Sequence, residues 1–278
     1  MSMAQKKTTD EAPADSVKKK KSKSREYIEA LLTAGLIAFF LRSFVVEAFK
    51  IPSGSMIPTL MVGDHIFVNK FIYGIRVPFT RKWLWKYKNP ERGEPIVFIY
   101  PKDPSMDYIK RVVGLPGDII RLEGDDVFVN GQKVENVPIS VKGPDAKDPD
   151  QIDLEPMEAF GKADPFKQIP RFENWDYYQF FVEKLGDHIH LKQEAPGQSE
   201  RLREWTVPPD HLFVMGDNRD NSQDSRWWGF VPIENVKGRA MIIWLSLRYK
   251  QDDPKFGWVG WTHFFHGFRW ERFGKLIE

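Results

Sequence analysis

One long apolar run stands out near the start of the chain. Residues 27–49 read YIEALLTAGLIAFFLRSFVVEAF, and residues 30–41 are apolar with one exception. A membrane-spanning helix needs about 20 mostly apolar residues. The uninterrupted apolar run is shorter than that, so a buried amphipathic helix is one alternative. A cleaved signal peptide is disfavoured because no small-x-small pattern follows. We favour a single span over residues 26–48, with Arg42 at the lipid interface.

Beyond this run, the pattern changes to short stretches rich in Val, Ile, Phe and Tyr, separated by turn residues. We interpret seven stretches as strands: 65–77, 94–100, 108–115, 118–134, 188–193, 211–217 and 239–247. Asn130-Gly131 is typical of a two-residue hairpin turn. A helix is predicted at 173–186. The predicted fold class is mainly β: an antiparallel, barrel-like domain with an inserted subdomain, preceded by one N-terminal transmembrane helix.

The same patterns divide the chain into six segments. They are a disordered basic tail (1–25), the anchor (26–48), the first part of the β domain (49–135), an inserted subdomain (136–205), the second part of the β domain (206–250) and an aromatic, basic C-terminal segment (251–278). The tail has too few apolar side chains to order itself. The C-terminal segment interleaves Trp and Phe with Arg and Lys, which suits either packing on the barrel or the membrane interface.

Charge and composition narrow the possibilities. The net charge of +2 does not point to a nucleic-acid partner. The basic block at 18–25 precedes the span, so the positive-inside rule places it in the cytoplasm and everything after residue 49 on the other side. The chain has no cysteine, which excludes a thiol nucleophile and thiolate metal sites. We expect no metal and no cofactor.

Two stretches suggest a nucleophile and its base. PSGSMIPT (52–59) is either a turn that leaves the anchor or a rigid turn whose prolines and glycine expose a serine hydroxyl beside bare backbone N–H groups. In DYIKRVVGLPGD (107–118), alternation directs Lys110 and Arg111 to opposite faces of a strand. Taken alone, Lys110 is better explained as a strand lysine whose ammonium reaches water than as a catalytic base.

A third stretch, MGDNRDNSQDSRWWGFVP (215–232), is dense in Asp, Asn and Arg. It is either a solvated loop or a loop locked by its own hydrogen bonds and ion pairs. None of the six histidines lies in the three stretches, so a Ser–His pair has little support. Lysine can also serve serine as a base. A lysine with a pKa near 10.4 is neutral in about one molecule in 2,500 at pH 7, and burial that lowers the pKa to roughly 8 makes about a tenth neutral.

Together, SGSMIPT after a membrane anchor, DYIKRVVGLPGD and GDNRDNSQDSRWWGFVP resemble the bacterial type I signal peptidases, membrane-bound serine proteases that use a Ser–Lys dyad. The resemblance implies that Ser55 is the nucleophile and Lys110 its general base. It implies an oxyanion hole made by the Ser53 hydroxyl and the Ser55 N–H. The supporting roles it implies are a hydrogen bond from Ser222 to Lys110, the pairs Asp217–Arg111 and Asp224–Arg226, and a place for Met56 along the substrate cleft.

The resemblance also sets the expected partners and location. It implies cleavage of signal peptides from exported pre-proteins after a small-x-small motif, by a monomer in the bacterial inner membrane with its catalytic domain outside the cytoplasm. The partners are then signal peptides and the lipid bilayer. Two alternatives stay open: a membrane-anchored Ser–Lys protease with another substrate, and an inactive binding or assembly factor on the same fold. The role of the 136–205 insertion is unassigned.

Overall fold

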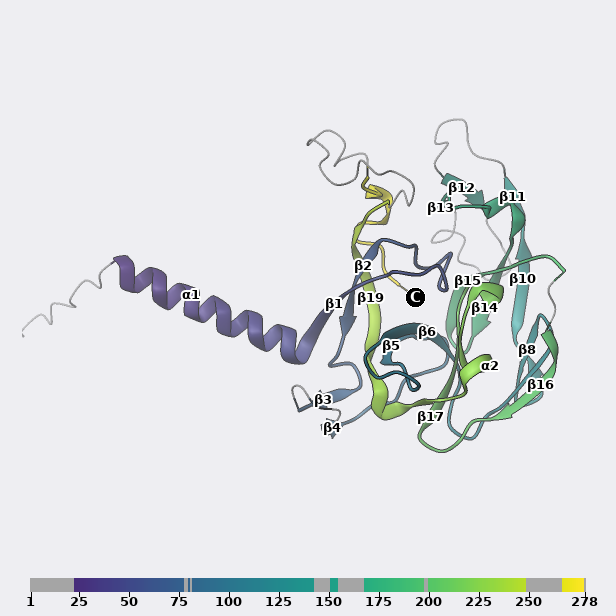
Figure 1. Ribbon diagram of the computed structural model, residues 1–278, viewed down its shortest axis with the longest axis horizontal. Helices are drawn as coiled ribbons and strands as arrows, with labels where there is room; N and C mark the ends of the chain where they lie inside the picture. The colour runs from purple at the N-terminus through teal and green to yellow at the C-terminus, as the bar shows by residue number, and fades with distance from the viewer. Residues whose placement is uncertain are drawn as a thin grey trace, which may run out of the picture. The chain divides into compact units, whose positions relative to one another are not determined.

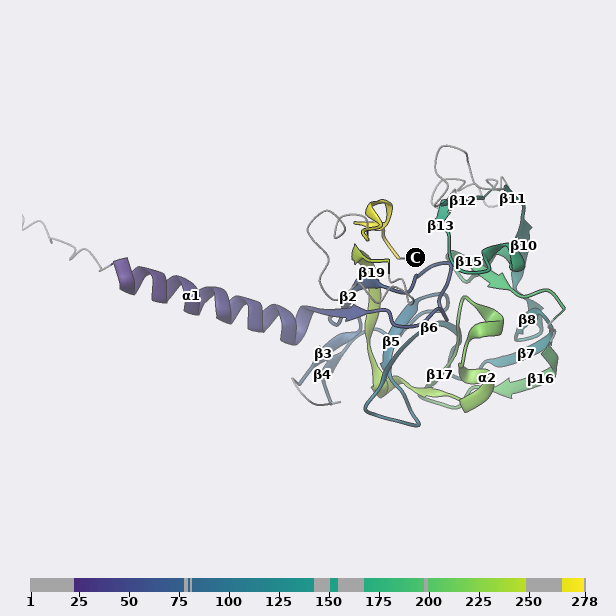
Figure 2. The same ribbon diagram turned by 45° about the horizontal axis from the view of Figure 1, so that its top comes forward.

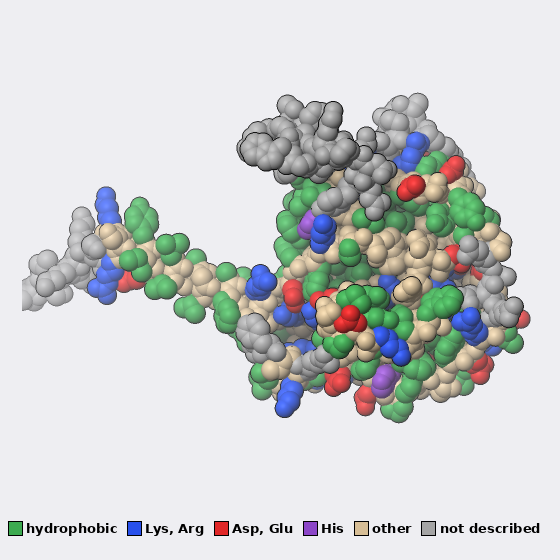
Figure 3. Space-filling model, viewed as in Figure 1, with side chains coloured by type: hydrophobic (Ala, Val, Ile, Leu, Met, Phe, Trp, Pro, Cys, Tyr) green, Lys and Arg blue, Asp and Glu red, His purple; other side chains and the backbone are tan. Residues whose placement is uncertain are grey.

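A computed structural model describes residues 23–77, 80, 82–142, 151–154, 168–197, 200–248 and 267–277. The chain divides into two compact units, Met1–Phe40 and Leu41–Glu278. The described part of the first unit is helix α1 (Lys23–Phe40), and a π-helical turn, η1 (Leu41–Val45), follows it. Apolar side chains line α1 and are exposed along its length (Figure 3).

Within the described residues, Lys23–Val45 is the one helical stretch long and apolar enough to cross a membrane, with a mean hydropathy of 1.8. This agrees with the predicted N-terminal span. Its far end differs from the expected limit at residue 48, because Val46–Lys50 form strand β1 instead. The backbone of β1 pairs along its whole length with β2, from Val46 opposite Asn69 to Lys50 opposite His65. That pairing satisfies backbone groups that a longer helix would have satisfied internally.

The second unit is built mainly of antiparallel strands (Figure 1). The strands are β1 (Val46–Lys50), β2 (Asp64–Asn69), β3 (Gly74–Arg76), β4 (Trp83–Lys86), β5 (Pro95–Ile99), β6 (Asp107–Gly114), β7 (Ile119–Gly124), β8 (Asp126–Val129), β9 (Gln132–Lys133), β10 (Glu135–Ile139), β11 (Val141–Lys142), β12 (Gln151–Leu154), β13 (Gln168–Pro170), β14 (Gln179–Leu185), β15 (His188–Glu194), β16 (Glu200–Thr206), β17 (His211–Met215), β18 (Val231–Pro232) and β19 (Val236–Ser246). The short helices are η3 (Trp175–Tyr177), η4 (Arg219–Asn221), α2 (Ser225–Trp228), η5 (Ile233–Asn235) and η6 (Trp270–Arg272).

A curled seven-stranded sheet, in the order β1-β2-β19-β5-β6-β17-β18, forms the centre of this unit (Figures 1 and 2). Four smaller sheets have the orders β16-β7-β8-β9, β10-β14-β15, β11-β12-β13 and β3-β4. The mainly-β prediction is therefore confirmed. Because β19 pairs with both β2 and β5, the sheet brings the start and the end of the β unit side by side.

Burial explains why these stretches form strands. In β2 the side chains alternate between buried and half-buried, as expected for a strand with one face on the core. In β5, Val97 faces one apolar cluster, with Met56 and Leu60, while Ile96 and Phe98 face another. A strand buried on both faces reads as a continuous apolar run, which is how PIVFI appears in the sequence.

One local prediction, a hairpin turn, is confirmed, and another, a helix, is wrong. Asn130 and Gly131 both have positive φ, 51° and 79°, and join β8 to β9 as expected. The predicted helix at 173–186 is wrong: η3 is one short turn and Gln179–Leu185 form β14. In β14 the backbone pairs with β10 on one side and β15 on the other, and this tertiary pairing outweighs local helix propensity.

Candidate active site

The segment that carries Ser55 is a closed loop between β1 and β2. The amide of Ile51 donates to the carbonyl of Asp64 at 2.8 Å, and the amide of Gly63 donates back to the carbonyl of Ile51 at 2.9 Å. Inside the loop, Met56 and Leu60 are buried in the core of the sheet. The buried apolar neighbours of the Ser53-Gly54-Ser55 tripeptide therefore hold it in one conformation.

Strand β6 places Lys110 against this loop. The Lys110 Nζ lies 2.6 Å from the Ser55 Oγ and 2.9 Å from the carbonyl oxygen of Ile109. Both side chains are nearly closed to solvent, with Lys110 4% and Ser55 8% exposed. The two residues are 55 positions apart in the chain, so this contact exists only in the folded sheet.

Burial lowers the pKa of Lys110 to about 8, because the ammonium loses its hydration. The carboxylates of Asp224 and Asp217 oppose this shift, and Arg226 adds to it. An amine with a pKa near 8 is neutral in about a tenth of molecules at pH 7. A neutral amine in contact with a serine hydroxyl can accept its proton, which an exposed lysine at this pH rarely can.

Backbone and hydroxyl donors lie next to the Ser55 hydroxyl. Ser53 is exposed, and its Oγ is 3.5 Å from the Ser55 Oγ. Within the part of the chain that the structure describes, the Ser55 backbone N–H has no hydrogen-bond acceptor. A free N–H and a nearby hydroxyl can together bind an oxygen that becomes negatively charged.

The two expected ion pairs both form behind the dyad. Arg111 makes a two-pronged contact with Asp217, from Nε and Nη2, at 2.8 Å each. Arg226 does the same with Asp224 at 2.8 Å each. All four side chains are buried, and burial of both charges together is tolerated because each guanidinium matches its carboxylate in shape. The charged partners hold the pKa of both Asp217 and Asp224 below the usual range despite their burial.

Two of the expected site residues, Ser222 and Met56, are not arranged as expected. The Ser222 Oγ is buried but has no hydrogen-bond partner, so the predicted bond to Lys110 is absent; the amine donates to Ser55 and the Ile109 carbonyl instead. Met56, expected along a substrate cleft, has no exposed surface (0%) and packs in the core. The family resemblance implied a place for Met56 along the cleft, but the turn directs this side chain into the core.

Sequence reasoning missed Asn218 and Gly216, which join the third motif to the nucleophile loop. The Asn218 side chain donates to the carbonyl of Gly54, and its backbone N–H donates to the carbonyl of Ser55, both at 3.1 Å. A Cβ on Gly216 would lie 2.4 Å from the Ser55 carbonyl oxygen and 2.3 Å from the Ser222 Oγ. Gly216 is thus required by close approach. The sequence indicated a role for Gly216 only through its position in the polar stretch 215–232.

A second buried polar group extends from β14 and β15 to the same loop. Glu183 accepts hydrogen bonds from both terminal nitrogens of Arg219. Lys192, which has no exposed surface, pairs with Glu194 and lies 3.5 Å from Glu183. His190 lies 3.2 Å from Glu183, and burial lowers the pKa of its imidazole to about 4, so it is neutral at pH 7. The inserted region therefore contributes directly to the rigidity of the 216–226 loop.

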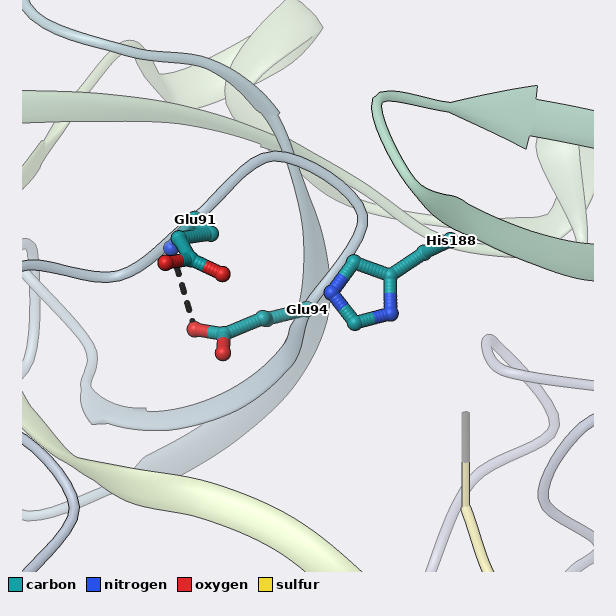
Figure 4. A group of neighbouring side chains, drawn as sticks. All are labelled: Glu91, Glu94 and His188. Carbon is teal, nitrogen blue, oxygen red and sulfur yellow. Dashed lines mark hydrogen bonds between the residues drawn. The ribbon is translucent and has the colours of Figure 1, made fainter.

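Among the residues that the structure describes, one set of side chains has the spacing of metal ligands. Glu91, Glu94 and His188 bring their ligand atoms within 4.8 Å of one another (Figure 4). The Glu94 carboxylate is already engaged: it accepts hydrogen bonds from Tyr73 at 2.6 Å and from the Glu91 amide at 3.0 Å, and Arg239 lies at 3.3 Å. These partners already satisfy the buried Glu94 carboxylate.

Comparison with known proteins gives one consistent result. The family described as signal peptidase, peptidase S26, matches residues 24–245. Signal peptidase I of Pseudomonas fluorescens is 41% identical over 234 residues, covering 80% of this chain and 72% of the relative. The Aquifex aeolicus protein of the same name is 34% identical over 234 residues, covering 80% and 84%. A solved signal peptidase I from Enterococcus faecalis V583 has 25% identity, covers 55% of this chain and 98% of its own, and has a TM-score of 0.29, too low to support an argument.

Proposed function

Because this chain belongs to the signal peptidase family, peptidase S26, we propose that it removes signal peptides from exported pre-proteins with Ser55 as nucleophile and Lys110 as general base. The chain is a serine endopeptidase, and its N-terminal apolar helix makes it a membrane-anchored one. The observation that carries the assignment of the dyad is the 2.6 Å contact between two buried side chains, Ser55 Oγ and Lys110 Nζ.

Each proton has a defined place in the proposed reaction. Neutral Lys110 takes the proton of the Ser55 hydroxyl as Oγ attacks the scissile carbonyl carbon. When the C–N bond breaks, the Lys110 ammonium gives that proton to the leaving amine of the mature protein, and the signal peptide stays on Ser55 as an ester. Lys110 then takes a proton from water, whose oxygen attacks the ester. As the ester C–O bond breaks, the Lys110 ammonium returns that proton to the Ser55 Oγ, and the signal peptide leaves as a carboxylic acid that releases its remaining proton to water.

The proposed oxyanion hole consists of the Ser55 N–H and the Ser53 hydroxyl. The free N–H and the 3.5 Å separation of the two hydroxyl oxygens support this assignment. Loss of one such donor lowers turnover by about 10²–10³. The Arg111–Asp217 and Asp224–Arg226 pairs are proposed to keep β6 and the 216–226 loop rigid, so that Lys110 does not move away from Ser55.

The substrate and the location follow from the family and from the chain. We assign small-x-small cleavage sites, the pattern that ends signal peptides. We place the chain in the bacterial inner membrane as a single-pass monomer, with the basic block at 18–25 in the cytoplasm and the catalytic unit outside. The positive charge of the Lys-rich block directly before the span supports this orientation.

Turnover of a pre-protein by the full chain in detergent tests the dyad. Ser55→Ala and Lys110→Ala are each expected to lower kcat by about 10⁴ or more, because the two groups act as one unit. Lys102→Ala is the matched control: this lysine is exposed and lies before β6, so turnover stays at the wild-type level. Full activity of either dyad variant would disprove the assignment, and a wild-type protein that does not cut would disprove the proposed function.

A further inference from the structure

The C-terminal residues 267–277, here called the C-terminal strap, lie outside the family match at 24–245. Two bridges join the strap to the middle of β19 and to the residue that follows this strand: Leu276 pairs with Ile242, and Phe268 pairs with Leu247. Figures 1 and 2 show it as the yellow segment beside β19. Its last residue, Ile277, is buried in one apolar cluster with Met56 and Leu60. The strap therefore packs on the loop that carries the nucleophile.

Arg272 is the side chain through which the strap reaches this loop. It is 1% exposed, and its Nε and Nη2 both contact the Asp64 carboxylate, at 3.1 Å and 2.6 Å. The Nη2 also donates to the carbonyl oxygen of Thr59 at 2.9 Å. Asp64 in turn accepts from the Met61 amide at 2.8 Å and from Ser246 at 2.6 Å. One guanidinium thus fixes both ends of the turn from Thr59 to Asp64.

Thr59 continues this set of contacts to the base. Its hydroxyl donates to the Asp217 carboxylate at 2.5 Å, and Asp217 holds Arg111, the neighbour of Lys110 in β6. The Leu60 amide donates to the carbonyl of Met56, the residue after Ser55, at 2.8 Å. Hydrogen bonds therefore run from the strap to the nucleophile on one side and to the strand that carries the base on the other.

We propose that Arg272 is a positioning residue for catalysis: the C-terminal strap uses it to hold the Ser55 loop against Lys110. This proposal rests on the proposed function of the dyad. A guanidinium can bond a carboxylate with two nitrogens and a backbone carbonyl at the same time, because its donors are fixed in a planar fork. A lysine in its place keeps the charge opposite Asp64 but lacks that fork, so the charge and the geometry can be separated experimentally.

Two variants of the full chain test the proposal. Arg272→Lys keeps the ion pair, and the double variant Arg272→Gln with Asp64→Asn removes both charges of that pair together. Arg269, whose Nη2 lies 3.8 Å from Asp64, keeps its hydrogen bonds to the carbonyls of Val62 and Leu247 in both variants. The control is Arg92→Gln with Asp118→Asn, an Arg–Asp pair at 2.9 Å that is more exposed than the Arg272–Asp64 pair and lies outside residues 55–64. We expect a lower kcat with KM within about twofold in both Arg272 variants, since a 1 Å displacement of a reacting group lowers rates by about 10². The control keeps the wild-type kcat and KM.

A second readout does not depend on turnover. NMR titration of Lys110 in the same proteins reports whether its amine is still covered by the Ser55 loop. In the Arg272 variants water reaches the amine, so its titration moves to higher pH from the wild-type midpoint near 8, whereas the control titrates like wild type. The acidic limb of kcat/KM moves in the same direction.

The outcomes separate the possible explanations. Variants that melt well above the assay temperature and keep the wild-type kcat and Lys110 titration would overturn the proposal. A loss of activity that only follows the unfolded fraction would overturn it too, because it shows a purely structural role. If wild type does not cleave pre-protein, the proposed function fails, and the Lys110 titration still decides whether Arg272 positions the loop.

Discussion

At the scale of single residues, the chemistry depends on an amine whose pKa burial lowers to about 8, so that a neutral fraction is available at its contact with a hydroxyl. Lys110 is held between β5 and the Ser55 loop, and its neighbours in the strand are Ile109 and Arg111. The Arg111 charge is neutralised by Asp217, so β6 can carry adjacent lysine and arginine residues inside the protein. The local sequence indicated this environment through apolar neighbours, but only the fold shows that Ser55 closes it.

The pKa of Lys110 predicts how activity depends on pH. The folded pKa of about 8 lies below the ordinary value of 10.5, so the neutral, reactive amine becomes dominant as pH rises through 8. We expect kcat/KM to rise about tenfold per unit of pH well below this midpoint and to level off above it. A pH–rate profile of the full chain with a pre-protein measures this, with Lys102→Ala as the control that follows wild type. A profile that is flat from about pH 5 to about pH 9 would contradict lysine as the base.

At the scale of elements, β14 shows how a strand far from the dyad in sequence supports it. Residues 179–185 contain helix-compatible residues, yet their backbone bonds to β10 and β15. The strand conformation directs Glu183 inward, where it binds Arg219 of the loop that also holds Asn218. A helix at this position would have lost the two ladders and exposed part of the buried set Phe180 and Val182.

The buried position of Glu183 predicts a large effect on stability. Glu183→Gln leaves the Arg219 guanidinium without its carboxylate, and we expect a loss of about 3 kcal/mol or more in the free energy of unfolding. That corresponds to a fall in Tm of at least about 6 °C for a protein of this size. Lys184→Gln is the control, because the next residue in β14 is exposed and should change Tm little. Equal melting temperatures for the two variants would show that Glu183 does not support the loop; thermal unfolding followed by circular dichroism measures both.

At the scale of the whole molecule, the apolar helix is the candidate membrane anchor and the β unit carries the proposed catalytic dyad. The span Lys23–Val45 leads within one residue into β1, which pairs with β2 at one edge of the curled sheet. The Ser55 loop joins the same two strands. The nucleophile is therefore only a few residues along the chain from the end of the span, which suits a substrate whose cleavage site follows an apolar segment.

The orientation of the span can be measured by reporter fusions. The Lys-rich block at 18–25 predicts a cytoplasmic N-terminus, so a phosphatase that is active only outside the cytoplasm should be active when fused after residue 277. The same reporter fused after residue 22 should be inactive, and the pair serves as its own control. The reverse result would place the catalytic unit in the cytoplasm, where exported proteins have not yet been cut, and would exclude the proposed orientation.

Much of this protein is determined by its sequence alone. The apolar run of α1, the strand runs such as β5 and β6 and the Asn130-Gly131 turn follow from short-range rules, because side-chain periodicity and backbone sterics act within a few residues. The three polar motifs implied, through the family that they resemble, that Ser55 and Lys110 act as a pair. The family resemblance was also contained in those motifs.

What only the tertiary structure decided is long-range. The strand at Gln179–Leu185, the inward turn of Met56, the unbonded hydroxyl of Ser222 and the strap that brings Arg272 to Thr59 all depend on partners far away in the chain. Backbone pairing and the burial of charge are settled by which segments meet, and local propensity does not record that. The sequence gives the chemical type of each residue, whereas the tertiary structure decides which distant residue lies beside it and changes its pKa or its position.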